Sequence, residues 1–452
     1  MPGQRLPISL SPLSPPRPGP TALDATPRGA EPARALYIHV PFCAHKCHYC
    51  DFYSFVDARD QQDAFVAALV TEFASLAPCA DPGGLHTIFI GGGTPSLLRP
   101  DLWRRLLAAL DEAFNLAPIR AGRGEFTVEC NPESTTPELM DALVAGGVDR
   151  VSVGAQSFDP TRLKTLERWH EPANVGRALA RAAAAGVHRR SVDLIYAIPG
   201  QTLDCVRADL DAALALSPGV EHLSVYCLTY EPNTPLTARA RRGDITPIDD
   251  DLAAEMQTLV HETLAAAGYE RYEVSNFAQT MQRSDQNNAD NPANHRPGSP
   301  RADARSMHNL AYWRSDGWLA AGPSASAHLL TTDARTGLPA GARWKNVPRL
   351  GDWIAGVTDT GSSPVVDHEP PDPSRALRER IMMGIRLREG LDAPLFLDHA
   401  RRLGRARAVR AAADRQAQLG LLLMGADRWR LTDAGFLRAD GVAATLMESI
   451  DP

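Results

Sequence analysis

Three cysteines lie close together near the amino terminus of this 452-residue chain. Cys43, Cys47 and Cys50 follow the spacing C-x3-C-x2-C and come directly after a short apolar segment. Cysteine thiolates are the ligands that hold iron–sulfur clusters, and three of them leave one iron of a four-iron cube free for another ligand. The spacing therefore predicts a [4Fe-4S] cluster with an open iron.

Zinc is the alternative metal for this segment. The same three cysteines with His45 or His48 would supply the four ligands of a tetrahedral zinc site. Such sites usually pair one short cysteine element with a distant second one, and this sequence has no second pair. The remaining four cysteines are scattered, which is typical of small buried residues rather than of a disulfide framework. The segment favours the cluster over zinc.

The elements that must position the cysteines repeat one pattern, a strand followed by a helix. Six such units are recognisable, and the first strand leads directly into the cysteine segment. The predicted strands are Ala35–Val40, His86–Ile90, Glu125–Cys130, Arg150–Gly154, Ser191–Tyr196 and Leu223–Leu228. Repeated strand–helix units imply parallel strands with crossover helices. The sequence therefore predicts an α/β fold, a partial (β/α)6 TIM-like barrel.

Polar residues and glycines gather where these strands end. The second strand runs into Gly91-Gly92-Gly93-Thr94, and later strands end in or contain Glu129, Gln156, Asp193 and Cys227. The carboxyl ends of parallel strands meet at one face of a barrel, where barrel enzymes place their sites. Taken alone, the glycines could form a tight turn and the two acids could cap helices. Beside the cysteines, they predict a polar pocket.

The rest of the chain divides into further regions. Residues 1–33 are rich in Pro, Gly and Ser and lack the apolar core of a secretory signal, which predicts a disordered tail. The barrel would cover 34–277. A flexible loop is expected at 278–306, where polar residues crowd without periodicity. A connecting region, 307–372, would lead to a small C-terminal winged-helix-like α+β domain at 373–452.

Composition and charge exclude several classes of protein. The chain is 44% hydrophobic, yet no apolar run approaches the roughly 20 residues that cross a bilayer. A formal net charge of -7 argues against a mainly electrostatic nucleic-acid binder. The arginine-rich stretch 401–410 is expected to form a solvated helix face. Without a secretory signal, the expected compartment is the cytoplasm.

Taken together, these motifs resemble the radical S-adenosylmethionine (SAM) superfamily. The likeness rests on the C-x3-C-x2-C segment after the first strand, Gly-Gly-Gly-Thr-Pro after the second, and the six strand–helix units. Within the superfamily, the segments around Tyr37, Glu129, Gln156 and Asp193 look like one branch. It contains oxygen-independent coproporphyrinogen III oxidase and the HemW-type haem chaperones. The C-terminal region then looks like the HemN-type C-terminal domain of that branch.

The resemblance implies that SAM is a second cofactor. SAM would bind the open iron, and the reduced cluster would split it into methionine and a 5′-deoxyadenosyl radical, with a flavodoxin or ferredoxin as the reductant. Positions that match SAM-contacting residues of the family lie at the strand ends and beside the cluster. They are Tyr37, Tyr49, Gly92, Gly93, Thr94, Glu129, Gln156, Arg168, Asp193 and Cys227.

Two segments distinguish the members of this branch. Oxidases carry another cysteine two positions beyond the third ligand, whereas this chain has Asp51 and Phe52 there, a pair typical of the haem chaperones. Met307–Trp313 resembles the H-N-x-x-Y-W segment associated with haem binding in the chaperones. His308 is therefore the candidate haem ligand, since imidazole is a common axial ligand of haem iron. Without the resemblance, His308 would be interpreted as a packed core histidine.

The resemblance thus implies a haem chaperone that binds a [4Fe-4S] cluster, SAM and haem and transfers haem to an acceptor. The expected acceptor is a respiratory haem protein, which could be membrane-associated. Such a chain would be a carrier rather than an enzyme. The alternative is a radical SAM coproporphyrinogen III oxidase, which decarboxylates the propionate side chains of its substrate, and Phe52 argues against it.

Overall fold

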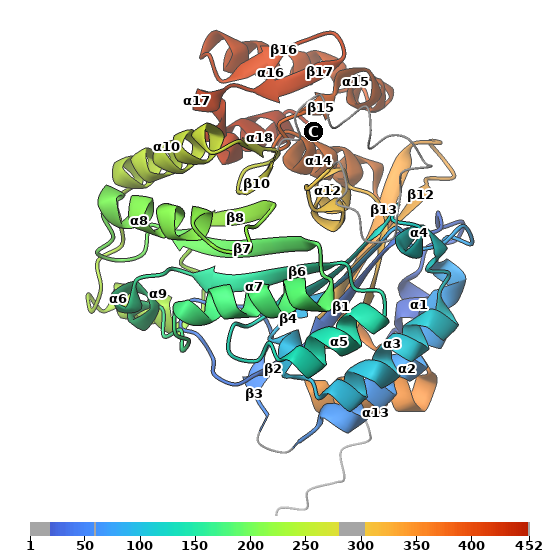
Figure 1. Ribbon diagram of the computed structural model, residues 1–452. Coiled ribbons are helices and arrows are strands. Elements are labelled where there is room, and N and C mark those ends of the chain that lie inside the picture. Colours follow the sequence, from blue (N-terminus) through green and yellow to red (C-terminus); the bar gives the residue numbers. More distant parts are fainter. Residues whose placement is uncertain (1–18, 58–59, 280–302, 451–452) are drawn as a thin grey trace, which may run out of the picture.

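The fold is built on one large sheet of twelve strands. The computed structural model describes residues 19–57, 60–279 and 303–450. The strand order is β14-β13-β12-β11-β1-β4-β5-β6-β7-β8-β10-β9. The sheet does not close, since β14 and β9 are its two edges. Helices α2, α3, α5 and α7 pack along one side of it (Figure 1).

The predicted α/β core of six parallel strands is confirmed. Neighbouring strands pair in parallel and in chain order. They are β1 (Ala35–Val40), β4 (Thr87–Gly92), β5 (Glu125–Cys130), β6 (Arg150–Gln156), β7 (Arg189–Tyr196) and β8 (His222–Cys227). The crossover helices include α2 (Gln62–Leu76), α3 (Pro100–Ala113), α5 (Pro137–Ala145), α7 (Ala173–Ala185) and α8 (Leu203–Leu214). The helices α9 (Pro235–Arg241) and α10 (Asp250–Ala266) follow β8.

The two faces of the strands carry different residues. On β5, Phe126 and Val128 belong to the hydrophobic core under the helices. Because side chains alternate along a strand, Glu125 and Glu129 point to the opposite face. Leu69 and Phe73 of α2, one turn apart, are fully buried against the same core. The apolar residues therefore determine which face of the sheet packs against the helices, and polar groups such as Glu125 and Glu129 lie on the opposite face.

The region predicted to be a connection, 307–372, extends the sheet instead. The strand β11 (Trp318–Ala321) pairs in parallel with β1, and β12 (Ser326–Thr332), β13 (Pro339–Asn346) and β14 (Val365–Glu369) follow in antiparallel order. The helix α13 (Leu350–Thr360) connects β13 to β14. At the other edge, β9 (Tyr269–Arg271) and β10 (Asn276–Gln279) are antiparallel additions to β8.

The prediction of a disordered tail is wrong for residues 19–33. A short helix, α1 (Ala22–Ala25), is capped by Thr21, and the Ala22 amide donates to the Ser363 carbonyl at 2.8 Å. The Glu31 amide donates to the Leu330 carbonyl at 2.8 Å. The partners lie some 300 residues away, so local composition could not reveal them. Residues 1–18 of the predicted tail lie outside the described residues, as do residues 280–302, which make up most of the predicted flexible loop. Ala278, the first residue of that predicted loop, belongs to β10.

The C-terminal domain has its own core and its own sheet. The core includes Phe396, Trp429 and Phe436. The helices are α14 (Pro373–Gly384), α15 (Ala393–Arg402), α16 (Ala406–Gln418), α17 (Asp433–Phe436) and α18 (Ala439–Glu448), and the sheet order is β15 (Leu391–Asp392), β17 (Arg428–Leu431), β16 (Leu422–Met424). The strands β16 and β17 pair antiparallel as a hairpin.

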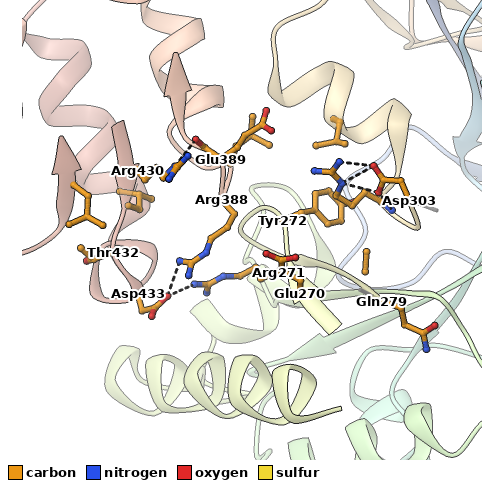
Figure 2. Close-up of a pocket in the computed structure, with 16 residues that line it drawn as sticks. Glu270, Arg271, Tyr272, Gln279, Asp303, Arg388, Glu389, Arg430, Thr432 and Asp433 are labelled. Carbon is orange, nitrogen blue, oxygen red and sulfur yellow. Dashed lines mark hydrogen bonds and ion pairs between the residues drawn. The ribbon is translucent and has the colours of Figure 1, made fainter. Parts of the chain in front are cut away.

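Contacts with arginines join this domain to the barrel. Arg271 of β9 and Arg388, which follows α14, both donate to the Asp433 carboxylate (Figure 2). The Arg388 amide also donates to the Tyr272 carbonyl at 2.9 Å. The described residues include no helix long and apolar enough to cross a membrane.

Candidate functional site

A cavity of about 640 Å³, called here the cluster cavity, opens at the carboxyl ends of the parallel strands. The structure brings to its wall the three predicted cluster cysteines and nine of the ten residues predicted to contact SAM. The cavity-lining residues from that prediction are Cys43, Cys47, Cys50, Tyr49, Gly92, Gly93, Thr94, Glu129, Gln156, Arg168, Asp193 and Cys227. Residues from five different strands and the cysteine segment therefore converge on one space.

The cysteine segment is held at both ends by local structure. The short strand β2 (Phe42–Cys43) pairs in parallel with β3 (Phe55–Val56), which closes the loop that carries the cysteines. All three thiols are free, and Cys47 is buried. The Thr94 hydroxyl lies 3.6 Å from the Cys43 sulfur. The loop therefore presents three unpaired sulfurs to the cavity.

This arrangement suits a cluster better than a single metal ion. Among the residues that the structure describes, no three His, Cys, Asp or Glu side chains converge as ligands of one ion. A cubane instead needs thiolates that are spread out, because each binds a different iron. His45, one of the two candidates for a fourth zinc ligand, stacks on Trp169 with ring centroids 3.7 Å apart.

Arg168 ties the cysteine loop to the end of β6. One guanidinium nitrogen lies 3.8 Å from the Cys47 sulfur, and another donates to the Gly154 carbonyl at 3.0 Å. Its Nε is buried without a hydrogen-bond partner in the described structure. The neighbouring Gln156 has a backbone φ of +66°, which is unfavourable for a residue with a side chain. A buried cation beside the sulfurs would stabilise the negative charge of a thiolate-bound cluster.

The glycine run packs tightly against the cysteine segment. Gly92 has φ of +105°, and a Cβ added there would lie 2.5 Å from the His39 ring. A Cβ on Gly93 would meet the Phe42 carbonyl at 2.7 Å. The Gly92 amide donates to Glu129 and the Gly93 amide to the Val40 carbonyl. The glycines are therefore needed for close packing, and these two amides are already bonded within the protein.

Two half-buried carboxyl groups face the cluster cavity without a salt bridge in the described part of the chain. Burial raises the pKa of Glu129 to about 7, and the charge of Asp193 adds to the shift. Burial also raises the pKa of Asp193, although the Ser152 hydroxyl bonds its two oxygens at 3.0 and 3.1 Å. Two acids in one desolvated space favour a cationic ligand. The sulfonium and ammonium groups of SAM fit this requirement.

Two predicted residues lie outside the cluster cavity, Tyr37 and His308. The Tyr37 hydroxyl bonds His39 Nδ1 at 3.0 Å, and its ring stacks on Phe89. His308 lies on α12 (Met307–Trp313), where its Nδ1 contacts the Thr87 hydroxyl at 2.9 Å. Thr87 is the first residue of β4, so α12 covers the amino ends of the strands, opposite the cysteines.

His308 is buried and neutral in this position. It is 2% exposed, and burial lowers its pKa to about 4. The ring packs against Phe89 and Tyr312, and its Nε2 has no hydrogen-bond partner in the described structure. Imidazole in this state could coordinate iron through Nε2 only if α12 moved.

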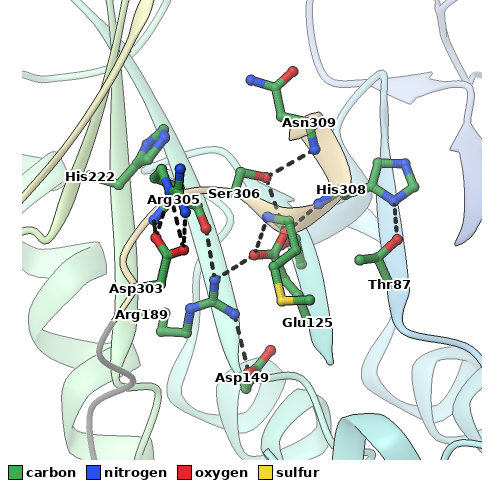
Figure 3. A network of polar contacts seen from close by, with 12 residues as sticks. Thr87, Glu125, Asp149, Arg189, His222, Asp303, Arg305, Ser306, His308 and Asn309 are labelled. Carbon is green, nitrogen blue, oxygen red and sulfur yellow. Dashed lines mark hydrogen bonds and ion pairs between the residues drawn. The ribbon is translucent and has the colours of Figure 1, made fainter. Parts of the chain in front are cut away.

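A buried carboxylate missed by the sequence interpretation holds α12 in place. Glu125 accepts hydrogen bonds from the Ser306 hydroxyl at 3.0 Å and from the amides of Met307 and His308 (Figure 3). It also pairs with Arg189. Burial alone would raise the pKa of Glu125, but Arg189 and Arg150 outweigh it and hold that pKa well below the usual range. Glu125 was predicted only as a strand residue, since nothing nearby in the sequence indicates a partner 181 positions away.

Comparison with known proteins gives two matching families and several similar chains. Residues 37–213 match the radical SAM superfamily, and residues 372–438 match the HemN C-terminal domain. The chain is 37% identical to heme chaperone HemW of Mycobacterium tuberculosis, over 91% of this chain and 94% of that protein. It is 32% identical to heme chaperone HemW of Lactococcus lactis, over 79% of this chain and 82% of that protein.

One solved structure is similar over almost the whole fold. Coproporphyrinogen III oxidase (HemN) from Escherichia coli, a radical SAM enzyme, superimposes with a TM-score of 0.72 at 20% sequence identity. The match covers 94% of this chain and 92% of that one. At this identity the likeness concerns the fold, including the C-terminal domain.

Proposed function

The chain belongs to the HemW family of radical SAM proteins, and from this membership we propose that it is a haem chaperone. It binds a [4Fe-4S] cluster, SAM and haem, and it passes haem to an acceptor protein. The observation that carries the cofactor assignment is the cluster cavity. It gathers three free cysteines, Arg168, and two acids, Glu129 and Asp193, for which the described structure gives no salt bridge. Phe52, at the position where oxidases carry a cysteine, is 59% exposed.

We propose the following roles for the cavity residues. The three cysteines hold the cluster, and Arg168 balances its charge. Glu129 and Asp193 face the cationic groups of SAM, while the glycine run sets the width of the cavity. When bound, cluster and SAM together supply one-electron chemistry that protein side chains lack. Tyr37 does not line the cavity, so we leave it out of the SAM-contacting set.

We further propose that haem binds on the side of α12, at the amino end of the barrel. His308 remains the candidate iron ligand, because its unsatisfied Nε2 becomes available once α12 shifts. The proposed setting is the cytoplasm, with a flavodoxin or ferredoxin as the reductant. The proposed acceptor is a respiratory haem protein, which could be membrane-associated.

A haem titration of anaerobically reconstituted protein, with and without cluster and SAM, tests this function. We expect saturable haem binding followed by transfer to a haem-free acceptor protein. The competing function, oxidative decarboxylation of coproporphyrinogen III, is tested by expressing the chain in a strain that lacks the oxidase. Restored haem synthesis in that strain, or the absence of haem binding by the reconstituted protein, would overturn the proposal.

A further inference from the structure

A second cavity, called here the interdomain cavity, lies between the barrel and the C-terminal domain and has a volume of about 1010 Å³. Its barrel side is formed by β9, β10 and α12, and its other side by the β16–β17 hairpin and the segment after α14 (Figure 2). None of its lining residues belongs to the cluster cavity. Ligand sites commonly occupy such spaces between domains.

Three arginines of the interdomain cavity, Arg271 of β9 and two from the C-terminal domain, have few carboxylate partners. Arg271 and Arg388 share a single carboxylate, that of Asp433, at 3.2 and 3.1 Å. Within the described residues, the Arg430 guanidinium donates to the Glu389 backbone carbonyl alone, at 3.1 Å. The Glu389 carboxylate is already engaged by Arg314. Three guanidinium groups therefore face one available carboxylate, which leaves two positive charges.

The lining as a whole holds four arginines and four acids, so the surplus is local to the arginines around Asp433. Asp303 and Arg305 form a pair with each other on the barrel side. Glu270, the remaining acid, is exposed, and the described structure gives it no salt bridge. Its charge is therefore well screened by solvent. Arg388 and Arg430 are exposed as well, so Arg271 carries the positive charge that solvent screens least.

Arg271 shows that the surplus is partly desolvated. Its side chain is only 4% exposed and stacks over the Phe436 ring, with the guanidinium carbon 3.9 Å from the ring centroid. Its Nε is buried without a hydrogen-bond partner in the described structure. Burying a cation without full compensation is unfavourable, and a bound anion relieves that cost.

Part of the remaining wall of the interdomain cavity is apolar, beside the polar Gln279 and Thr432. Tyr272, Ala278, Leu310 and Leu387 form one small hydrophobic cluster that faces it. Leu423 of the hairpin lies opposite and is 59% exposed, although it is a large hydrophobic residue. A flat apolar ligand would cover this leucine. Leu310 belongs to α12, so the segment that carries His308 forms part of the wall.

We propose that the interdomain cavity is the binding site of the porphyrin cargo and that Arg271, Arg388 and Arg430 bind its two propionate carboxylates. The macrocycle then packs on the apolar wall formed by Tyr272, Leu387 and Leu423. A dianion with a flat apolar body matches both the three arginines that lie beside one carboxylate and the apolar part of the wall. This inference rests on the proposed function, because it takes haem to be the cargo.

The test compares haem with its dimethyl ester, in which both propionates are uncharged. Each is titrated into the full-length cluster-loaded protein and into the double variant Arg388→Gln/Arg430→Gln. Arg271 is left unchanged because it also joins the domains. Arg401→Gln serves as the matched control, since that arginine lies in the same domain, is 73% exposed and does not line the cavity. Circular dichroism and cluster absorbance report whether each variant is folded.

We expect the wild-type protein to bind haem at least about tenfold more tightly than the ester, because charge-assisted hydrogen bonds are lost in the ester. The double variant should bind haem about as weakly as the ester, and Arg401→Gln should bind like the wild type. If wild-type protein binds haem and the ester equally, the arginine site is refuted while the proposed function stands. If it binds neither, the proposed function fails as well. Should the double variant misfold, the ester comparison on wild-type protein decides.

Discussion

The raised pKa of Glu129 predicts that SAM binding depends on pH. In the ligand-free protein, burial and the nearby Asp193 charge bring the pKa of Glu129 to about 7. A cationic ligand is bound best by the ionised carboxylate. SAM should therefore bind more tightly as pH rises through 7, with Glu129 losing its proton to accommodate the ligand.

The size of this effect follows from the pKa. A carboxyl with pKa near 7 is about one-tenth ionised at pH 6 and about nine-tenths ionised at pH 8. If only the ionised form binds, the dissociation constant falls roughly tenfold between these pH values, about 1.4 kcal/mol. The variant Glu129→Gln keeps the shape of the side chain and removes the titration.

Equilibrium dialysis of SAM against the anaerobically reconstituted protein at pH 6, 7 and 8 provides the measurement. The amino group of SAM titrates in the same range as other α-amino groups, near pH 8. That contribution is identical for both proteins, so the difference between the two profiles isolates Glu129. A wild-type profile as flat as that of Glu129→Gln would refute the assignment of Glu129 to the cationic part of SAM.

The same shift has a consequence for folding. The folded-state pKa of Glu129 is raised from 4.5 to about 7, so the folded protein holds the proton more tightly than the unfolded chain. The stabilisation from this proton is fully present below pH 4.5 and is lost as pH rises through 7. A shift of this size corresponds to roughly 3 kcal/mol. The cluster-free wild type should therefore lose more unfolding free energy than Glu129→Gln between pH 5 and pH 8, as measured by urea titration.

Three further predictions concern other residues. Replacing any one of the three cluster cysteines with serine should abolish the brown absorbance of the reconstituted protein. The control Cys205→Ser, outside the cavity, should retain it. Full cluster content in one of the three cysteine variants would show that this cysteine is not a cluster ligand. Glu125→Gln should lower the free energy of unfolding by up to about 3–5 kcal/mol, because it leaves the buried Arg189 with only its longer contact to Asp149 at 3.4 Å. The exposed Glu138→Gln should change it by less than about 0.5 kcal/mol. A loss as small as that of Glu138→Gln would mean that Glu125 does not hold α12. His308→Ala should weaken haem binding with the cluster absorbance unchanged, and an unchanged haem titration would make His308 a packing residue only.

Sequence patterns predicted the parallel core because the relevant signals are local. The boundaries of the six strands differ from those expected by at most two residues. The cysteine spacing and the glycine run sit at the ends of adjacent strands, and strand order then brings them together. For this reason nine of the ten residues assigned to SAM line one cavity.

Features that depend on distant contacts could not be predicted in the same way. Residues 19–33 have the composition of a disordered segment, yet their backbone bonds Ser363 and Leu330, which nothing in the segment indicates. His308 was predicted as a haem ligand from a family signature, but only the structure shows that its ring is buried and bonded to Thr87. The interdomain arginines escaped notice because Arg271, Arg388 and Arg430 are far apart in sequence.

The positions of the two cavities bear on whether the chain carries porphyrin or reacts with it. Along β8, Tyr226 and Cys227 at the carboxyl end line the cluster cavity. His222 at the amino end pairs with Ala278, which lines the interdomain cavity. Five residues of strand separate these ends by about 16 Å. Decarboxylation requires the propionate carbons to lie beside SAM, whereas the arginine site would hold them at the opposite end of the strand. A porphyrin bound there is out of reach of the SAM site, so this geometry favours carriage of an intact porphyrin over its oxidation.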